Sequence, residues 1–341
     1  MGYVFYGKNE GKVQHFKYRI RFSNRGNFEK QEGIRMKRAR IIYNPTSGRE
    51  AFKKRLPEVL EKFEIAGYET SCHATTCEGD ATVAAREAVK RDFELIVAVG
   101  GDGTLNEVVA GVSEFENRPK IGLIPMGTTN DFARAVRIPR DINKAVDIIL
   151  QGDTLPVDVG LANDRYFINI AGGGRITELT YEVPSKLKTV LGQLAYYLKG
   201  IEMLPSIKAT NMRIEYDGEV FEEEAMMFLI GLTNSVGGFE KLAPDASIND
   251  GLFSVFILKK CNIADFIKLV TLAVRGEHLK DSHVIYTKAK EVKVYSEDKI
   301  QLNLDGEYGG DAPAVFKNLK RHIELFVPIE DIRAEDRIEA E

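Results

Sequence analysis

Cysteine is scarce in this sequence of 341 residues, and tryptophan is absent. The three cysteines, Cys72, Cys77 and Cys261, cannot all pair with one another, so we do not expect a disulfide framework. Reduced cysteines are typical of a cytoplasmic protein, which is the location that we expect. Cys72, His73 and Cys77 lie close together, but no second cysteine or histidine pair lies nearby to complete a zinc site. We interpret this segment as a strand end and the loop after it.

Long apolar runs are also missing. The longest are Leu95 to Gly100 and Ala225 to Leu232, whereas a membrane-spanning helix needs roughly 18 or more apolar residues. The first residues lack the apolar stretch of a secretory signal. The formal net charge is only −4, so the composition does not favour a nucleic-acid partner. A hydrophobic fraction of 44% over this length is enough for a packed core and favours two domains.

The two ends of the chain differ from the rest. Basic residues outnumber acidic ones in residues 1–35, which show no sustained helical or strand period. We expect a disordered leader there, with the folded protein beginning near Met36; a basic arm attracted to membranes is the alternative. At the other end we expect residues 331–341 to form an acidic tail that frays after Glu330.

The first half of the folded part alternates short apolar runs with helical periods. This order predicts a parallel sheet with helices on both faces, which binds ligands at the carboxyl ends of its strands. The predicted strands are 39–43, 68–73, 95–99 and 121–124, and the predicted helices are 49–65, 80–90 and one from about 104.

After about Asp158 the pattern changes to many short strands. Asp217-Gly218 between two of them is typical of a hairpin turn. We predict an antiparallel β domain with helical insertions. Its strands are expected at 166–171, 209–216, 219–232, 252–258, 291–295 and 299–304, its helices at 175–203 and 262–275, and a final strand at 322–327.

Three polar turns rich in glycine each follow a predicted strand of the parallel sheet. Glycines let backbone N–H groups approach phosphate oxygens, and a following helix N-terminus favours negative charge. Any one such turn is also an ordinary strand-to-helix connection with an N-capping residue. Three on one sheet edge favour phosphate binding. The turns are Asn44–Gly48, Gly100–Thr104 and Gly127–Asp131.

Asp102 in the second turn repels phosphate, so its natural use is to hold Mg²⁺ directly or through water. The known phosphate-binding signatures do not explain these turns. The sequence contains no Gly-x-x-x-x-Gly-Lys-Ser/Thr loop, and the first β-α turn lacks the Gly-x-Gly-x-x-Gly dinucleotide pattern.

Taken together, the three turns resemble those of the diacylglycerol kinase catalytic family, most closely its soluble bacterial members. The resemblance is carried by Asn44-Pro45-Thr46-Ser47-Gly48, Gly100-Gly101-Asp102-Gly103-Thr104 and Gly127-Thr128-Thr129-Asn130-Asp131, and covers about residues 37–328. Gly-Gly-Asp-Gly-Thr alone is shared with NAD kinases and phosphofructokinases, whereas the combination is specific.

The resemblance implies an α/β plus β architecture: an NAD-kinase-like α/β nucleotide-binding domain and a β-sandwich domain, with the active site between them. It places residues 36–158 and 318–330 in the ATP-binding domain and residues 159–317 in the lipid-substrate domain. The residues expected to meet ATP are Asn44, Pro45, Thr46, Ser47, Gly48, Thr75, Gly101, Asp102, Gly103, Thr104, Leu105, Asn106, Glu107 and Thr128.

The sequence Asp305-Gly306-Glu307 resembles the catalytic Asp-Gly-Glu of this family. A lipid hydroxyl is a poor nucleophile, and a nearby carboxylate can accept its proton during attack on the γ-phosphate. Asp305 and Glu307 are both candidates, and in an extended segment both would share one face. Asp-Gly is also a favoured hairpin turn, so an ordinary turn is the alternative.

A second oxygen-rich loop, residues 243–252, resembles the family's structural Mg²⁺ site. The resemblance makes Ser247, Asp250 and the carbonyl of Leu252 its ligands. An ordinary polar turn before a strand is the alternative. We also hypothesise that Asp158 joins Asp102 and water around the catalytic metal.

The expected activity is transfer of the γ-phosphoryl group of ATP to diacylglycerol with Mg²⁺. The alternatives are a kinase for another lipid, such as a sphingoid base or ceramide, and a non-catalytic nucleotide- or lipid-binding protein. A substrate held in a bilayer implies peripheral contact with an anionic membrane surface. Residues 186–204, which include Lys199, keep a helical apolar period that favours burial, with membrane contact as the alternative. The resemblance also implies a homodimer.

Overall fold

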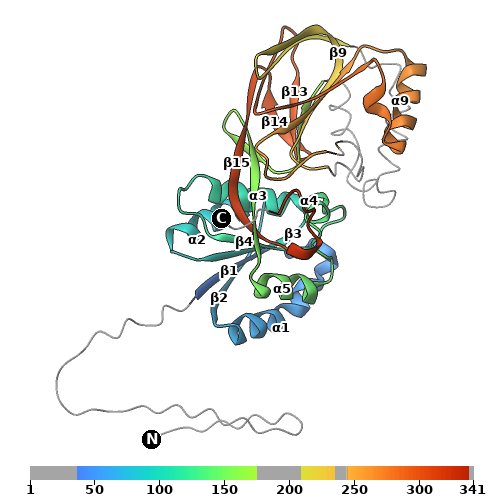
Figure 1. Cartoon of the computed structure of the whole chain (residues 1–341). Coiled ribbons are helices and arrows are strands. Elements are labelled where there is room, and N and C mark those ends of the chain that lie inside the picture. Colours follow the sequence, from blue (N-terminus) through green and yellow to red (C-terminus); the bar gives the residue numbers. More distant parts are fainter. Residues whose placement is uncertain (1–36, 175–208, 235–242, 244, 338–341) are drawn as a thin grey trace, which may run out of the picture. The chain divides into compact units, whose positions relative to one another are not determined.

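The computed structural model describes residues 37–174, 209–234, 243 and 245–337 (Figure 1). The first part of this range forms a parallel sheet in the order β2-β1-β3-β4. Every residue of the inner strand β3 is buried, as expected for a strand covered on both faces. The strands are β1 (Lys37–Tyr43), β2 (Tyr68–Ala74), β3 (Leu95–Gly100) and β4 (Lys120–Pro125).

Helices cover both faces of this sheet. In Figure 1, α2 and α3 pack together on one face, and α1 and α5 pack together on the other. The sequence spacing explains the packing of α2, because Ala81, Ala84, Ala85 and Ala88 recur at helical intervals and are all buried. The helices are α1 (Ala51–Ile65), α2 (Asp80–Lys90), α3 (Asp102–Ser113), α4 (Asp131–Ala135) and α5 (Ile142–Gln151), with a 3₁₀ turn, η1 (Ser47–Glu50).

The later strands are antiparallel and enclose a second hydrophobic core. Phe167, Phe228, Phe253 and Phe316 are fully buried in it. Asp217 and Gly218 both have positive φ, as the predicted hairpin requires. The elements are β5 (Thr154–Ala162), β6 (Arg165–Phe167), β7 (Ile170–Gly173), β8 (Thr210–Tyr216), β9 (Glu219–Gly231), β10 (Phe253–Lys259), α9 (Ile263–Arg275), η3 (His278–Lys280), β11 (Val284–Ala289), β12 (Glu291–Ser296), β13 (Gln301–Leu304), β14 (Glu307–Asp311), β15 (Ala314–Phe326) and η4 (Ile329–Asp331).

The long strand β15 belongs to both groups of strands. Its first residues pair with β12, and Leu325 near its end lies parallel to Ile121 of β4. Strand β5 runs antiparallel to β15 along most of its length. The last strand therefore returns to the first sheet, as the resemblance implied, and it carries the sheet from one core to the other.

The structure differs from the sequence prediction at several strands. The predicted strand 166–171 is split into β6 and β7, and β15 begins eight residues before His322. A positive φ at Arg321 and a register shift between Leu319 and Ile323 interrupt the alternation there, which hid the first half of β15. Strands β5, β11 and β14 were not predicted. Residues 1–35 and the predicted helix 175–203 lie outside the described part.

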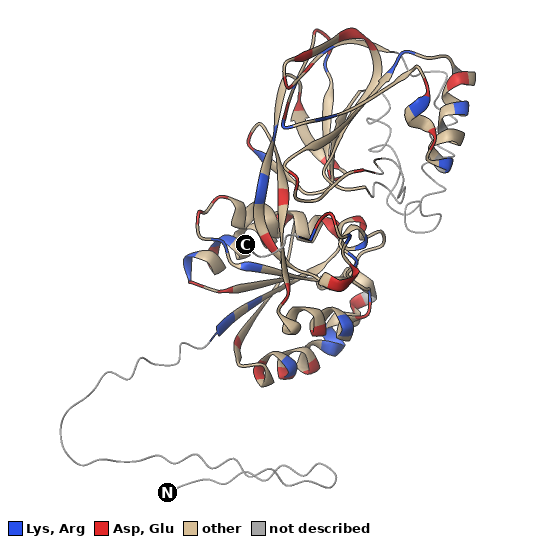
Figure 2. Ribbon diagram, in the orientation of Figure 1, with Lys and Arg blue, Asp and Glu red and all other residues tan. Residues whose placement is uncertain are grey.

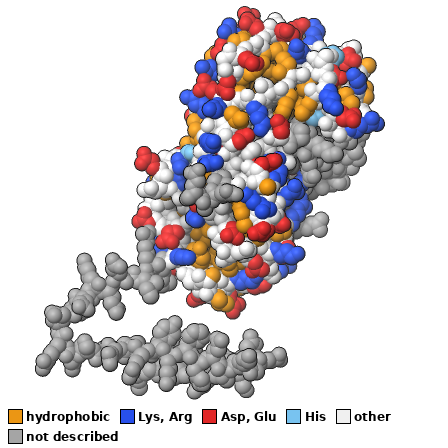
Figure 3. Space-filling model, in the orientation of Figure 1, with side chains coloured by type: hydrophobic (Ala, Val, Ile, Leu, Met, Phe, Trp, Pro, Cys, Tyr) orange, Lys and Arg blue, Asp and Glu red, His pale blue; other side chains and the backbone are white. Residues whose placement is uncertain are grey.

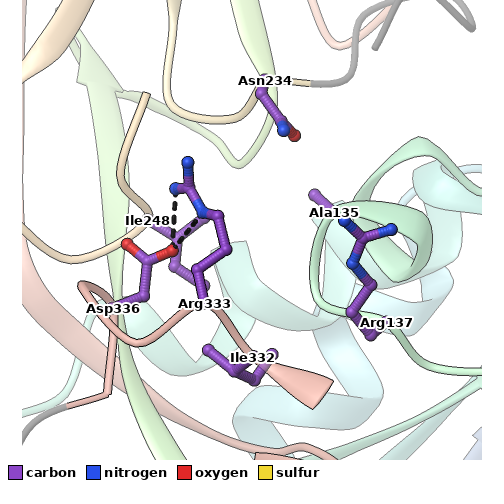
Figure 4. A pocket seen from close by; sticks show the side chains of 7 residues that line it. All are labelled: Ala135, Arg137, Asn234, Ile248, Ile332, Arg333 and Asp336. Atoms are coloured by element: carbon purple, nitrogen blue, oxygen red, sulfur yellow. Dashed lines mark hydrogen bonds and ion pairs between the residues drawn. The ribbon is translucent and has the colours of Figure 1, made fainter. Parts of the chain in front are cut away.

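The prediction that the chain frays after Glu330 is wrong for residues 331–337. Ile332 and Asp336 are buried, and Arg333 donates to the Asp336 carboxylate (Figure 4). The Asp336 carboxylate also accepts a hydrogen bond from Ser247. The acidic composition suggested a solvated tail, but these charges are paired and packed against another loop.

Within the residues that the structure describes, no helix is both long enough and apolar enough to cross a membrane.

Candidate active site

The three glycine-rich turns meet at the carboxyl edge of the parallel sheet. The backbone N–H of Asn44, after β1, donates to the carbonyl of Val99 in β3 at 3.0 Å. The N–H of Met126, after β4, donates to the carbonyl of Gly100 at 2.7 Å. The second turn therefore lies between the other two, because β3 lies between β1 and β4 in the sheet.

Glycine is needed where these turns touch. A Cβ atom on Gly127 would lie 2.5 Å from the Cα of Gly101, closer than real Cβ contacts allow. Gly48 has a φ of +57°, and a Cβ atom there would lie 2.5 Å from the Cε atom of Met126. These three glycines let the turns approach one another through their backbones.

The first turn is folded by its own asparagine. The side-chain oxygen of Asn44 accepts from the N–H of Thr46 at 3.0 Å and from its hydroxyl at 2.8 Å. Thr75, at the end of the neighbouring β2, donates its N–H to the carbonyl of Tyr43 at 2.9 Å. Asn44 through Gly48 and Thr75 therefore lie at the ends of adjacent strands.

Asp102, in the second turn, binds the third turn. Its two carboxylate oxygens each accept a backbone N–H, from Asp131 and from Phe132, both at 3.1 Å. These bonds cap the start of α4 and bring the backbone of Asp131 beside the Asp102 carboxylate. The Asp131 carboxylate itself lies 3.6 Å from Nη1 of Arg134. The sequence places Asp131 in the third turn but does not indicate a metal-binding role for it, because only the fold brings the second and third turns together.

The three residues that follow the second turn, Leu105, Asn106 and Glu107, differ in their surroundings. Leu105 is buried in the core and its N–H donates to Gly101, while the Glu107 carboxylate accepts from the N–H of Ala81 and caps α2. Both residues therefore take part in the packing and capping of these helices, and their expected contact with ATP stays a prediction. Asn106 differs, because its side-chain oxygen is buried without a hydrogen-bond partner among the described residues. A polar ligand would satisfy it.

The third turn is closed by Asn130, which has a φ of 52°. Its side-chain oxygen accepts from the N–H of Gly127 at 2.8 Å, and its side-chain nitrogen donates to the carbonyl of Gly127 at 2.9 Å. Asparagine tolerates the left-handed conformation because its short polar side chain can bond to the local backbone. Thr128 and Thr129 therefore form the tip of a turn that Asn130 closes at its base.

Asp305 and Gly306 form a hairpin between β13 and β14, with φ values of 51° and 96°. The Asp305 carboxylate accepts three backbone N–H groups, from Ile168 at 2.7 Å, Asn169 at 2.9 Å and Ile170 at 2.8 Å. Burial raises the pKa of Asp305 to about 6, although these three bonds oppose the rise. Asp305 thus holds together the connection between β6 and β7.

Glu307, the first residue of β14, faces the second turn. A Cβ atom on Gly103 would lie 3.5 Å from its Oε1 atom. Burial raises the pKa of Glu307 above the ordinary glutamate value, and the charges of Glu78 and Glu107 raise it further. A carboxylate with a raised pKa beside the N-terminus of α3 is suited to accept a proton.

Of the two conformations considered for Asp305-Gly306-Glu307, the structure has the hairpin turn and not the extended segment that would place both carboxylates on one face. Asp305 lies in the hairpin turn itself, where the positive φ reverses the chain, and only Glu307 lies in a strand. The Asp305-Gly306 hairpin and the candidate catalytic residue Glu307 therefore lie in the same segment. Because of the turn, the two carboxylates have different surroundings.

The loop containing Ser247, Asp250 and Leu252 is tightly bonded. The Ser247 hydroxyl donates to Asp336 at 2.6 Å, and the Asp250 carboxylate accepts from the N–H of Leu252 at 2.9 Å and from Lys288 at 3.2 Å. A hydroxyl that donates its hydrogen keeps lone pairs for a cation. Of the three residues, Asp250 is thus already partnered by a positive charge.

Asp158 lies beside this loop. Its carboxylate accepts from the N–H of Gly251 and from the N–H of Arg321, both at 2.7 Å. Burial raises its pKa, and the Asp250 charge adds to the rise. The structure thus groups Asp158 with Asp250, whereas it groups Asp102 with Asp131 and Asp305. This grouping does not favour a metal ion that Asp158 and Asp102 both bind directly.

In the described residues, no three histidine, cysteine or acidic side chains gather closely enough to hold an ion by themselves. The donors at the turns fit Mg²⁺ in another way, because this ion commonly uses one or two carboxylates together with phosphate oxygens and water. The segment Cys72 to Cys77 shows no metal-binding arrangement: His73 lies 2.9 Å from Asp80, and both cysteines are free.

Comparison with known proteins gives consistent matches. The family model "Diacylglycerol kinase catalytic domain" matches residues 38–162, and the model "YegS C-terminal NAD kinase beta sandwich-like domain" matches residues 178–327. A diacylglycerol kinase of Bacillus subtilis is 67% identical over 296 residues, covering 86% of this chain and 98% of the relative. One from Staphylococcus haemolyticus is 58% identical over 301 residues, covering 88% and 91%. A crystal structure of a diacylglycerol kinase from Bacillus anthracis aligns with a TM-score of 0.68 at 26% identity, covering 86% and 97%.

Proposed function

This chain belongs to the diacylglycerol kinase family, and from this we propose that it transfers the γ-phosphoryl group of ATP to the hydroxyl of diacylglycerol, giving phosphatidic acid. One observation carries the proposal. The three glycine-rich turns contact one another at one sheet edge, and Glu307 faces the same edge beside Gly103. Phosphoryl transfer requires this pairing of a phosphate site with a proton acceptor.

The turns would bind the nucleotide phosphates through backbone N–H groups. The first N–H groups of a helix have no partner within it, so those of Asp102, Gly103 and Thr104 at the start of α3 are available to an anion. Thr128 and the Ser47 hydroxyl would supply further donors on either side, while the Thr46 hydroxyl already donates to Asn44. The orphaned side-chain oxygen of Asn106 also suits a polar ligand.

Asp102 and Asp131 would hold Mg²⁺ together with phosphate oxygens. The ion, when bound, neutralises charge on the phosphates. Removing free Mg²⁺ with a chelator is expected to abolish turnover.

Glu307 is our candidate for the general base. Its raised pKa and its position beside Gly103 support this role. The Asp305 carboxylate is already committed to three backbone N–H groups, which makes it a positioning residue for the 168–170 segment. We therefore assign to the Glu307 carboxylate the role of accepting the proton of the lipid hydroxyl.

For the second metal we propose Ser247, Asp250 and the carbonyl of Leu252 as ligands. Occupation would require Lys288 to release Asp250, because a cation and an ammonium group would compete for one carboxylate. Asp158, bonded to Gly251 within this loop, would help to position it.

The test is a lipid panel with labelled ATP and Mg²⁺. Dioleoylglycerol, sphingosine and ceramide would be presented separately in micelles, and the lipid products separated and counted. We expect labelled phosphatidic acid. Labelled product from only sphingosine or ceramide would support a kinase for another lipid, and nucleotide binding without any labelled lipid would support a non-catalytic binding protein.

We further propose a cytoplasmic homodimer that contacts anionic membranes peripherally, since its substrate resides in a bilayer. Basic and acidic side chains are interspersed along the ribbon and on the face shown in Figure 3 (Figures 2 and 3). The helix expected at 186–204, including Lys199, lies outside the described residues. Vesicle flotation with and without anionic lipid, and sedimentation equilibrium, would test these two proposals.

A further inference from the structure

Arg140 is bonded to the tip of the third turn. Its Nη2 atom donates to the carbonyl oxygens of Thr128 at 2.6 Å and Thr129 at 3.0 Å. Arg134 donates to the same Thr129 oxygen at 2.9 Å. Both carbonyl groups at the tip are therefore directed toward arginine side chains rather than toward solvent.

This orientation decides where the N–H groups of the tip point. In a trans peptide the C=O and N–H bonds are antiparallel, so the N–H groups of Thr129 and Asn130 point away from Arg140. Within the described part of the chain, neither N–H has a hydrogen-bond acceptor. Two adjacent donors on one side of a turn form a concave site for an anion.

Without the hydrogen bonds from the arginine side chains, the two peptide groups at the tip would be free to rotate. The Asn130 side chain bonds to the N–H and the carbonyl of Gly127 at the base of the turn, and not to the two peptide groups at the tip. A rotation of either peptide would present a carbonyl oxygen to the phosphate and repel it. Hydrogen bonds from a charged donor are stronger than neutral ones and oppose that rotation.

We infer that Arg140 is a positioning residue that holds the Thr128–Asn130 peptides with their N–H groups toward a nucleotide phosphate. The inference rests on the proposed function, because it assigns a role to Arg140 within the same phosphate site. Arg140 does not itself contact the phosphate in this scheme. It acts through two carbonyl groups that it binds from behind.

Arg137 provides a matched control. It lies three residues away and is exposed, and it lines a small pocket with Asn234 and Arg333 (Figure 4). Among the described residues, the side chains that donate to the two tip carbonyls are Arg134 and Arg140 and not Arg137, so Arg137→Met removes the same charge from the same segment and leaves the two peptides held.

The experiment compares the full chain with Arg140→Met, Arg140→Lys and Arg137→Met. MgADP binding is measured by calorimetry, kcat and KM for ATP by the lipid assay, and folding by thermal melts. Loss of hydrogen bonds to a charged donor is expected to weaken MgADP binding and raise the KM for ATP about 10-fold in Arg140→Met, with a smaller change in kcat.

Arg140→Lys keeps the charge but loses the planar fork, so we expect an affinity between those of wild type and Arg140→Met. Arg137→Met should change MgADP affinity less than about twofold, because an exposed charge acts through screening solvent.

Three results would overturn the inference: unchanged MgADP affinity in folded Arg140→Met, an equal loss in Arg137→Met, or no MgADP binding by wild type. If wild type binds MgADP but phosphorylates no diacylglycerol, the proposed function fails while the binding comparison still tests Arg140.

Discussion

Two carboxylates that are adjacent in the sequence motif have different surroundings in the fold. Asp305 is bonded to three backbone N–H groups of a distant segment, whereas Glu307 faces the N-terminus of α3. A residue that completes the backbone hydrogen bonding of its neighbours contributes to stability. Glu307 instead lies beside the turn where we propose that the nucleotide phosphates bind.

We predict that Glu307→Gln lowers turnover by about 10²–10⁴-fold, the usual effect of losing a general base, while MgADP binding and the unfolding temperature stay near wild type. Asp305→Ala should instead lower the free energy of unfolding by about 3 kcal/mol, because it leaves three N–H groups without their acceptor. Steady-state kinetics and urea denaturation measure the two effects. Normal turnover in Glu307→Gln would show that another residue is the general base.

The raised pKa of Glu307 predicts a pH dependence. Glu307 must be ionised to accept a proton, so kcat/KM should rise with pH over a range above the ordinary glutamate pKa of about 4.3. Glu78→Gln removes a negative charge that raises this pKa, and the acidic limb should move to lower pH by a few tenths of a unit.

Glu87→Gln is the control for this shift, since Glu87 is paired with Lys90 on the surface of α2 and does not act on Glu307. The interpretation is contradicted if Glu78→Gln moves the limb upward, or if both variants move it equally.

At the scale of elements, the phosphate site depends on turns that pack backbone against backbone. Gly101 and Gly127 are in contact, and the Asp102 carboxylate bonds the start of α4 to the start of α3. The second and third turns are therefore held in place by each other as well as by their own strands. Such mutual support fixes the positions of N–H groups that a single loop would leave mobile.

Gly127→Ala should disrupt this packing. The added methyl group would lie 2.5 Å from the Gly101 Cα atom, so the second and third turns must separate. We expect MgADP affinity to fall by at least about 10-fold, as misplaced binding groups commonly cause losses of this size.

Gly152→Ala is a suitable control, because Gly152 has a φ of 97° at the end of α5 and a Cβ there would contact nothing within 4 Å. It should cost about 1 kcal/mol of stability and leave MgADP affinity unchanged. Equal affinity losses in the two variants would show that backbone strain, and not the contact between the turns, causes the effect.

At the scale of the whole molecule, two segments join parts of the chain that are far apart in sequence. Strand β15 connects the antiparallel strands to the parallel sheet. The last described residues then pack on the 243–252 loop, where Asn249 donates to the Asp336 carbonyl at 2.8 Å. The candidate metal loop is therefore held by residues near the end of the chain.

Asp336→Ala should lower the free energy of unfolding by about 2 to 3 kcal/mol, since Ser247 and Arg333 would lose the carboxylate they bond to. The neighbouring variant Glu335→Ala should cost less than about 1 kcal/mol, because that carboxylate is 68% exposed. Urea denaturation of the two variants measures the difference. Equal stabilities would mean that the terminal segment does not support the loop.

The sequence by itself determined the alternating α/β pattern and the three phosphate-site turns. Buried strands such as Leu95–Gly100 are apolar throughout, and the turns need glycine and short polar residues, so both leave a local signature. The hairpin at Asp305-Gly306 was visible for the same reason, because positive φ angles restrict which residues can occupy it.

Only the tertiary structure decided which polar groups work together. Asp305 bonds to Ile168, Asp158 to Gly251 and Asp336 to Ser247, and these partners are separated by 137, 93 and 89 positions in the sequence. No periodicity or spacing encodes such contacts, because they depend on how separate elements pack. The same chemical group therefore has two roles: the Asp305 carboxylate stabilises the fold, and in our proposal the Glu307 carboxylate accepts a proton.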